Sequence, residues 1–177
     1  GADSTIQALE THGIAWFGTN EGLNSVHIYE KDGIRIGFIG GYASHWIINR
    51  EDLTASMEEL NRAGCNAIVA VMHGGAEYSV MRDKYQQRMA SWLARNGADV
   101  IIGHHPHVVQ GMDIIEDVSV IYSLGNFSFG GNRELRAQYA LVARVELRFD
   151  EHLVYQGHQI NLIPVSPSGT PDINNYQ

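Results

Sequence analysis

The sequence predicts an α/β protein in which a mixed β-sheet is covered by helices. Short apolar runs alternate with segments of helical periodicity through the middle of the chain. Two of these runs, residues 67–72 and 99–102, are followed at once by a histidine or by Gly103 and several histidines. Both observations are typical of open α/β sheets, which carry their chemistry where parallel strands end.

The bulk composition fits one globular domain. The chain has 177 residues, of which 44% are hydrophobic and 18% are charged. Its net charge of −8 and the lack of any run of Lys and Arg argue against a nucleic-acid partner. The apolar runs are too short to cross a bilayer and no signal peptide opens the chain, so any membrane anchor would lie outside this sequence. Cys65 is the single cysteine, which excludes an internal disulfide framework and fits an inert buried thiol.

The periodicity of the first half predicts five elements. Residues 3–12 read as a short helix and residues 14–18 as a strand. A hairpin follows, with arms at 26–30 and 34–40. Residues 50–63 form a helix that Gly64 closes.

The second half predicts a β-α-β crossover over residues 67–102, with its helix at 83–96. A strand at 118–122 and a long hairpin with arms at 138–150 and 153–164 complete the set. The segment 166–177 is rich in Pro, Ser, Asn and Gly and is expected to be a loosely ordered tail.

The stretch Gly103-His104-His105-Pro106-His107 is the strongest functional signal. A buried strand that ends in glycine would release three imidazoles together at its carboxyl end. Imidazole is the commonest metal ligand, and Pro106 stiffens the turn so that two of the rings can face one site. The alternative is a polar loop with solvent-facing histidines.

His73 ends the other apolar strand and is followed by two glycines. If the two strands are parallel neighbours, His73 and the histidines at 104–107 lie at the same edge of the sheet. The alternative is a plain strand-to-helix connection. Asn126 could orient a histidine or a ligand, although an ordinary turn is equally compatible. His45 could line a pocket, whereas His27, His152 and His158 are not expected at the site.

Four motifs carry a family resemblance when they are read together. They are His73-Gly74-Gly75-Ala76-Glu77-Tyr78, Gln87-Arg88-Met89-Ala90, the stretch from Gly97 to Gln110, and Tyr122-Ser123-Leu124-Gly125-Asn126-Phe127. Their order and spacing over residues 73–129 resemble the bacterial capsule synthesis protein family CapA, also called the poly-γ-glutamate biosynthesis family. Residues 160–171 also resemble the closing strand and tail of that family.

The resemblance implies a calcineurin-like metallophosphoesterase-type β-sandwich flanked by helices, with a site for two divalent ions such as Mn, Fe or Zn. It implies His73, His105 and His107 as metal ligands, with His104 as a rival for one of these places. His104 and Glu77 are then the candidates for acid catalysis. Asn126 and Tyr78 would support the ligands.

One departure from the family pattern bears on activity. The amino-terminal Asp, the second acidic motif and the Asn-His motif of the family cannot be placed here. Residues 1–165 are therefore expected to be the carboxyl-terminal portion of a single domain truncated at its amino end. Because a metal pair needs anionic ligands, this chain should bind metal weakly and be inactive alone.

Three hypotheses follow for function. The first is a metal-dependent hydrolase that acts on a phosphoester or a related polymer linkage. The second is a non-catalytic cell-envelope protein that helps to assemble or export an anionic capsular polymer. The third is a small-ligand binding domain, which explains the histidines but not the four motifs.

The same reading predicts the setting of the protein. The resemblance implies an extracytoplasmic place in the cell envelope and a membrane-anchored synthesis complex, with a cytoplasmic location left open. Uncovered sheet edges could pair two copies into a homodimer. The negative net charge disfavours direct capture of polyglutamate without bridging cations.

Overall fold

The computed structural model describes residues 2–20, 23–45, 48, 50–127 and 139–165. The predicted tail at 166–177 lies outside these residues. The elements, in chain order, are α1 (Ala2–Thr11), β1 (Gly18–Asn20), β2 (Leu23–Ser25), β3 (His27–Lys31), β4 (Ile34–Tyr42), α2 (Arg50–Arg62), β5 (Ala67–His73), α3 (Lys84–Arg95), β6 (Val100–His104), β7 (Met112–Ile115), β8 (Val118–Ile121), β9 (Ala140–Phe149) and β10 (Tyr155–Val165).

The main sheet has six strands in the order β3-β4-β5-β6-β8-β7. Its four central strands, β4, β5, β6 and β8, run parallel, and the edge strands β3 and β7 pair antiparallel to their neighbours. The strand β5, the helix α3 and the strand β6 form the crossover that the sequence predicts. The predicted α/β class is therefore confirmed.

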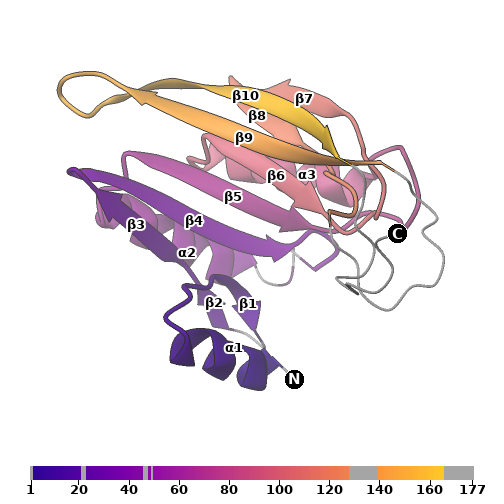
Figure 1. The fold of residues 1–177 in the computed structure, drawn as a ribbon, viewed down its shortest axis with the longest axis horizontal. Helices are drawn as coiled ribbons and strands as arrows, with labels where there is room; N and C mark the ends of the chain where they lie inside the picture. Colours follow the sequence, from indigo (N-terminus) through magenta and orange to yellow (C-terminus); the bar gives the residue numbers. More distant parts are fainter. Residues whose placement is uncertain (1, 21–22, 46–47, 49, 128–138, 166–177) are drawn as a thin grey trace, which may run out of the picture.

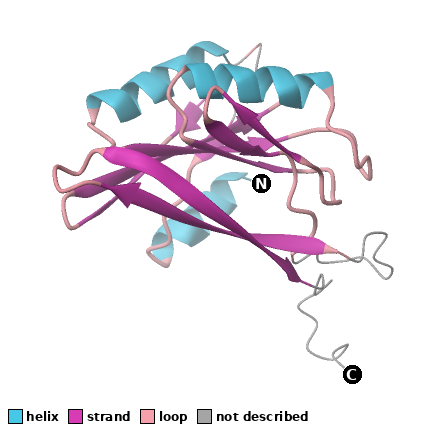
Figure 2. Ribbon diagram, turned by 90° about the horizontal axis from the view of Figure 1, so that it is seen from above, coloured by secondary structure: helices cyan, strands magenta, loops and turns pink. Residues whose placement is uncertain are grey.

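The molecule is layered, with helices on one face of the sheet and a hairpin on the other. Figure 2 shows two helices above the sheet, and Figure 1 identifies them as α2 and α3. The antiparallel β9–β10 hairpin crosses the opposite face. This second, two-stranded layer gives the chain the sandwich plan that was expected, with helices flanking one side.

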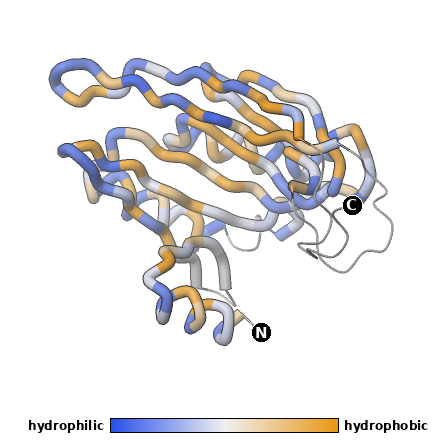
Figure 3. Tube along the Cα trace, in the orientation of Figure 1, coloured by the Kyte–Doolittle hydropathy of each residue, from blue (hydrophilic) through white to orange (hydrophobic). Residues whose placement is uncertain are grey.

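The core lies between the sheet and the two helices. Alternate residues of β5 face α2 and α3, because successive side chains of a strand point to opposite faces. The buried apolar side chains there are Ile39, Leu53, Met57, Leu60, Ile68, Ala70, Met72, Met89, Leu93, Ile101 and Val120. Figure 3 shows β5 and β6 as largely hydrophobic, whereas the tip of the hairpin is hydrophilic.

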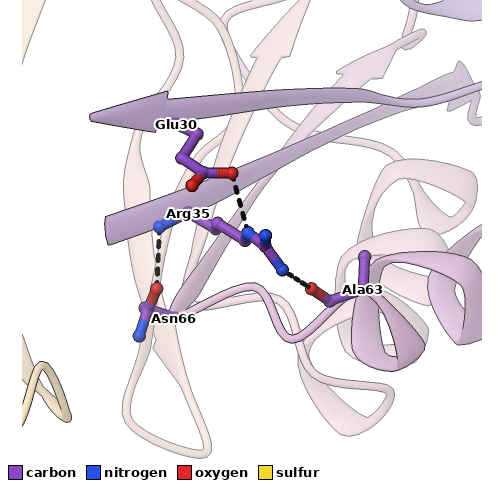
Figure 4. Close-up of polar contacts among 4 residues, drawn as sticks. All are labelled: Glu30, Arg35, Ala63 and Asn66. Atoms are coloured by element: carbon purple, nitrogen blue, oxygen red, sulfur yellow. Dashed lines mark hydrogen bonds and ion pairs between the residues drawn. The ribbon is translucent and has the colours of Figure 1, made fainter. Parts of the chain in front are cut away.

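Arg35 ties the β3–β4 hairpin to the end of α2 (Figure 4). Its guanidinium donates to the carbonyl of Ala63 at 2.8 Å and pairs with Glu30 at 2.9 Å. Its backbone N–H donates to the side chain of Asn66 at 2.7 Å, and Asn66 in turn donates to the carbonyl of Leu153. Asn66 thus links the sheet to the β9–β10 hairpin.

One local prediction is wrong, and the strands β2 and β7 were not predicted. Residues 14–17 form no strand, because the chain leaves α1 with the N–H of Ile14 bonded to the carbonyl of Leu9, and β1 starts at Gly18. The sequence also gave no sign of β7. Its turn into β8 uses Glu116 and Asp117 at φ values of 50° and 68°, where glycine or asparagine is the usual signal.

None of the helices in the described parts of the chain combines the length and the apolar character that crossing a bilayer requires.

Candidate functional site

The candidate site lies where β5 and β6 end. These strands are parallel neighbours, and their register places His73 opposite His104. Both side chains lie on the sheet face away from α2 and α3, since Met72 and Ile101 of the same strands belong to the core between sheet and helices. The expectation that the two strand ends share one edge is therefore met.

Three imidazole rings gather at this edge. The ring centroids of His73 and His105 are 4.8 Å apart, and those of His105 and His107 are 5.9 Å apart. The ring of Tyr42 meets His73 edge-on at 5.3 Å. Residues from three separate segments, β4, β5 and the loop after β6, thus converge.

The backbone of the loop is strained at the histidines. His105 has a φ of 104° and His107 a φ of 60°, and Tyr78 beside them also has a φ of 60°. Non-glycine residues reach such values at a cost of about 1–3 kcal/mol each, and they cluster at functional sites. Three such residues, from the loops after β5 and β6, thus lie within one small region.

Hydrogen bonds hold the loop in place. The side-chain oxygen of Asn126 lies 2.7 Å from Nδ1 of His107. The N–H of Tyr78 donates to the carbonyl of Pro106 at 2.7 Å, and the N–H of Gly74 donates to that of His104 at 3.0 Å. The segment after β5 is therefore bonded directly to the segment after β6.

A pocket of about 180 Å³ opens at the cluster. It is lined by Tyr42, Ser44, His45, His73, Gly74, Gly75, Asp83, Tyr85 and His105. Sequence reasoning had suggested His45 for a pocket but missed Asp83, Tyr42 and Tyr85. The pattern Asp83-x-x-Gln86 is a capping box at the start of α3, and this signal could have placed Asp83 beside the histidines.

Burial sets the protonation of two histidines. It lowers the pKa of His73, and the neighbouring imidazoles of His105, His104 and His107 lower that pKa further. Burial also lowers the pKa of His104. Both shifts favour the neutral form of the ring, which is the form that offers a lone pair to a metal ion.

The remaining predicted residues are not among the three clustered imidazoles, but His104 and Tyr78 are their neighbours. His104 is half-buried at the end of β6, one residue before the rings that contact each other. Glu77 is exposed in the loop before α3. Tyr78 is half-buried, with its ring centroid 6.0 Å from that of His107.

The spacing of the rings can be tested against a bound ion. An ion about 2.1 Å from one nitrogen of each ring holds ring centroids about 4.5–5.3 Å apart at right or tetrahedral angles. The 4.8 Å between His73 and His105 fits, and the 5.9 Å between His105 and His107 is slightly wide. In the part of the chain that the structure describes, no group of three or more His, Cys, Asp or Glu side chains is already set to hold a metal. The nitrogens of these three rings therefore suit one metal ion. To reach it, the ring of His107 must move slightly toward His105.

The comparisons with known proteins now decide the family. The family model described as bacterial capsule synthesis protein PGA_cap matches residues 1–131. The chain belongs to this family.

Two curated relatives carry matching names. The capsule biosynthesis protein CapA of Bacillus anthracis is 27% identical over 148 residues, which cover 73% of this chain and 36% of the relative. The PGA biosynthesis protein CapA of Bacillus subtilis (strain 168) is 39% identical over 62 residues, or 35% of this chain and 16% of the relative. The chain thus spans about a third or less of the curated relatives it matches.

A solved structure shares the fold. A Staphylococcus aureus protein described as a 5'-nucleotidase superposes with a TM-score of 0.54 at 20% identity, over 80% of this chain and 29% of the other. The chain therefore shares its fold with this protein, which agrees with the layered α/β plan expected from the sequence.

Proposed function

We propose that His73, His105 and His107 form part of a divalent-metal-dependent hydrolase site for a phosphoester or related linkage of an anionic polymer. The main observation in support is that the three imidazole rings lie together where the parallel strands β5 and β6 end. Membership of the capsule synthesis family supports the polymer, and the name of the B. subtilis relative supports poly-γ-glutamate. The family also supports an extracytoplasmic place in the cell envelope, within a membrane-anchored synthesis complex.

In this proposal each residue has a defined task. Bound Mn, Fe or Zn ions would supply Lewis acidity at the substrate oxygen. We assign the Nδ1 proton of His107 to the hydrogen bond with the side-chain oxygen of Asn126, so that Nε2 would be the nitrogen that holds an ion. Tyr78 fixes the loop through its N–H bond to Pro106, and His104 or Glu77 gives a proton to the leaving group.

Direct metal titration tests the ligand assignment. Isothermal titration of the chain with Mn²⁺, Fe²⁺ and Zn²⁺ separately should show one weak site. Replacement His107→Ala should abolish it, and Asn126→Ala should weaken it about 10-fold or more because the ring loses its orienting partner. His152→Ala is the matched control, since His152 is exposed at the turn between β9 and β10.

The outcome separates the two leading hypotheses. If the triple variant His73→Ala/His105→Ala/His107→Ala binds each ion as well as His152→Ala does, the hydrolase proposal fails. The non-catalytic role in polymer assembly or export would then be the better description.

A further inference from the structure

A groove on the outer surface of the helical layer gathers positive charge. It has a volume of about 590 Å³ and is lined by Arg50, Lys84, Gln87, Arg88, Ser91, Trp92 and Arg95. Four of the twelve Lys and Arg residues of the chain are therefore in one place, in a protein of net charge −8. No acidic residue is among the described residues that line it.

Three of the cationic side chains lie in a row along α3. Lys84, Arg88 and Arg95 of α3 are four and seven residues apart, which places them on one face of the helix. Arg50 approaches from the first turn of α2. The row from Lys84 to Arg95 extends about 16 Å along the helix axis at 1.5 Å per residue.

Most of this charge is not neutralised. Within the described residues, Arg50, Lys84 and Arg88 form no ion pair, and Lys84 lies over the ring of Tyr85 at 5.1 Å. Arg95 pairs with Glu116 at 2.8 Å, but both side chains are more than half exposed, so that the pair is weak. Glu51 and Asp52 follow Arg50 on α2 without lining the groove.

The groove begins beside the candidate site. Asp83 and Tyr85 line the histidine pocket, and Lys84 between them lines the groove. A linear ligand lying along α3 would therefore reach the rim of the histidine pocket at the amino end of the helix, beside the capping carboxylate of Asp83.

We propose that this basic groove binds an extended polycarboxylate chain and leads it to the histidine site. A backbone of three bonds per unit spans about 3.6 Å when extended, so a γ-linked glutamate unit of five bonds spans about 6 Å. Lys84 and Arg88 are separated by about 6 Å along the helix axis, and Arg88 and Arg95 by about 10 Å, so the cations are spaced by roughly one to two polymer units. Gln87 and Ser91 can hydrogen-bond the amide groups, and Trp92 offers an apolar wall to the methylenes.

The charge pattern favours a polycarboxylate over a nucleic acid. Duplex DNA carries one charge per about 1.7 Å, and most of it would face the negative remainder of the chain. A polymer with one charge per about 6 Å needs only the groove. The polymer class rests on the proposed function, whereas the groove itself does not.

Fluorescence anisotropy tests the groove with a fluorescein-labelled γ-linked glutamate decamer and the purified chain, in buffer with a metal chelator. The double variant Lys84→Ala/Arg88→Ala should bind the decamer at least 10-fold more weakly than the natural chain. The control Lys31→Ala/Arg62→Ala removes the same charge from exposed positions elsewhere and should stay within twofold.

Each other outcome overturns the inference. It fails if the natural chain shows no binding, if the two double variants bind alike, or if single-stranded or duplex DNA displaces the decamer at lower concentration than unlabelled polyglutamate. The variant His73→Ala/His105→Ala/His107→Ala should keep full decamer binding. If the natural chain binds the decamer but no metal ion, the hydrolase site alone is contradicted, and if it binds metal but not the decamer, the groove alone is contradicted.

Discussion

Gly103 shows how one residue allows the site to form. A Cβ atom at this position would lie 2.0 Å from the carbonyl oxygen of Tyr122, which is far inside any real contact. Only a hydrogen atom fits between β6 and the segment after β8. Gly103 therefore lets the backbone pass Tyr122 closely just before the three histidines.

We predict that Gly103→Ala destabilises the fold by about 3 kcal/mol, since a buried backbone must shift to admit the methyl group. Urea unfolding followed by circular dichroism measures this. Gly111→Ala is the matched control, because a Cβ there meets nothing within 4 Å, and it should change stability by less than about 0.5 kcal/mol. Similar losses for both variants would refute the explanation.

The residue types of the site could be predicted, whereas their backbone geometry could not. A strand ending in Gly103 and a run of histidines points to the carboxyl edge of the sheet. The positive φ values of His105 and His107 carry no such signal, because glycine is the residue expected there. Tertiary hydrogen bonds, such as that from Tyr78 to Pro106, impose this conformation.

At the scale of elements, His158 joins the hairpin to the sheet. Its Nε2 lies 2.7 Å from the hydroxyl of Ser119 on β8, and its Nδ1 lies 2.5 Å from the hydroxyl of Tyr155. Burial lowers the pKa of His158, Asp99 raises it in part, and Arg148 lowers it. The net lowering means that the folded chain prefers the neutral ring.

This lowering predicts a pH-dependent stability. Since the pKa of His158 is lower in the folded chain, protons bind the unfolded chain preferentially. The neutral His158 ring therefore contributes its full stabilisation of the fold above the pKa of the unfolded chain, about 6.5. This contribution is lost as the pH falls from there toward the lower pKa of the folded chain. Urea unfolding between pH 7.5 and 5 should show this loss. The free energy of unfolding should fall with a smaller slope against pH in His158→Gln than in the natural chain.

The exposed His12 supplies the comparison for that experiment. His12→Gln should leave the slope unchanged. Some slope should remain in His158→Gln, because the pKa values of His73 and His104 are also lowered. A slope equal in the two variants would show that His158 does not couple the layers through its protonation.

Periodicity predicted the long elements but failed for the short ones. Helix α3 and strand β5 have the apolar spacing of buried elements, so their sequences indicate them directly. Residues 14–17 have the composition of a strand, but they have no strand partner within the described residues. Strand pairing depends on distant neighbours, which a local pattern does not contain.

For the whole molecule, we predict that a second copy pairs with the outer edge of β9. The N–H of Leu141 bonds to Leu124 and so points away from β10. By alternation, Val145 and Leu147 also direct their backbone groups to this edge, where the described residues provide no further strand. An open edge of this length favours pairing with another chain.

The charges along β9 are self-complementary. In an antiparallel pair centred on Leu147, Glu146 lies opposite Arg148 of the partner subunit and Arg144 lies opposite Asp150 of the partner subunit. Exposed Glu146 and Arg148 would then form opposite-charge pairs in both directions, as a two-fold dimer requires, although Glu146 also pairs with Arg144 of its own chain at 2.9 Å. We therefore predict this register for the homodimer expected from the sequence.

Sedimentation velocity at micromolar concentration tests this register. The natural chain should sediment as a dimer and Glu146→Arg as a monomer, because like charges then face each other. The double variant Glu146→Arg/Arg148→Glu should restore the dimer. A monomeric natural chain, or a double variant that stays monomeric, would contradict the model.

The basic groove illustrates what the sequence conceals at this scale. Its cations come from α2 and from one face of α3, so they never form a run in the sequence. The prediction that a chain of net charge −8 is unsuited to hold polyglutamate directly considered only total charge. Packing of two helices creates a local field of opposite sign.

The register between β5 and β6 also limits how this family can vary. Because His73 and His104 share a face only through the pairing of these strands, inserting one residue inside either strand would rotate its histidine to the helix side. Insertions after the strands would leave the facing intact. Natural length variation should therefore be concentrated in the loops beyond His73 and His107, and engineered grafts should preserve both strand lengths.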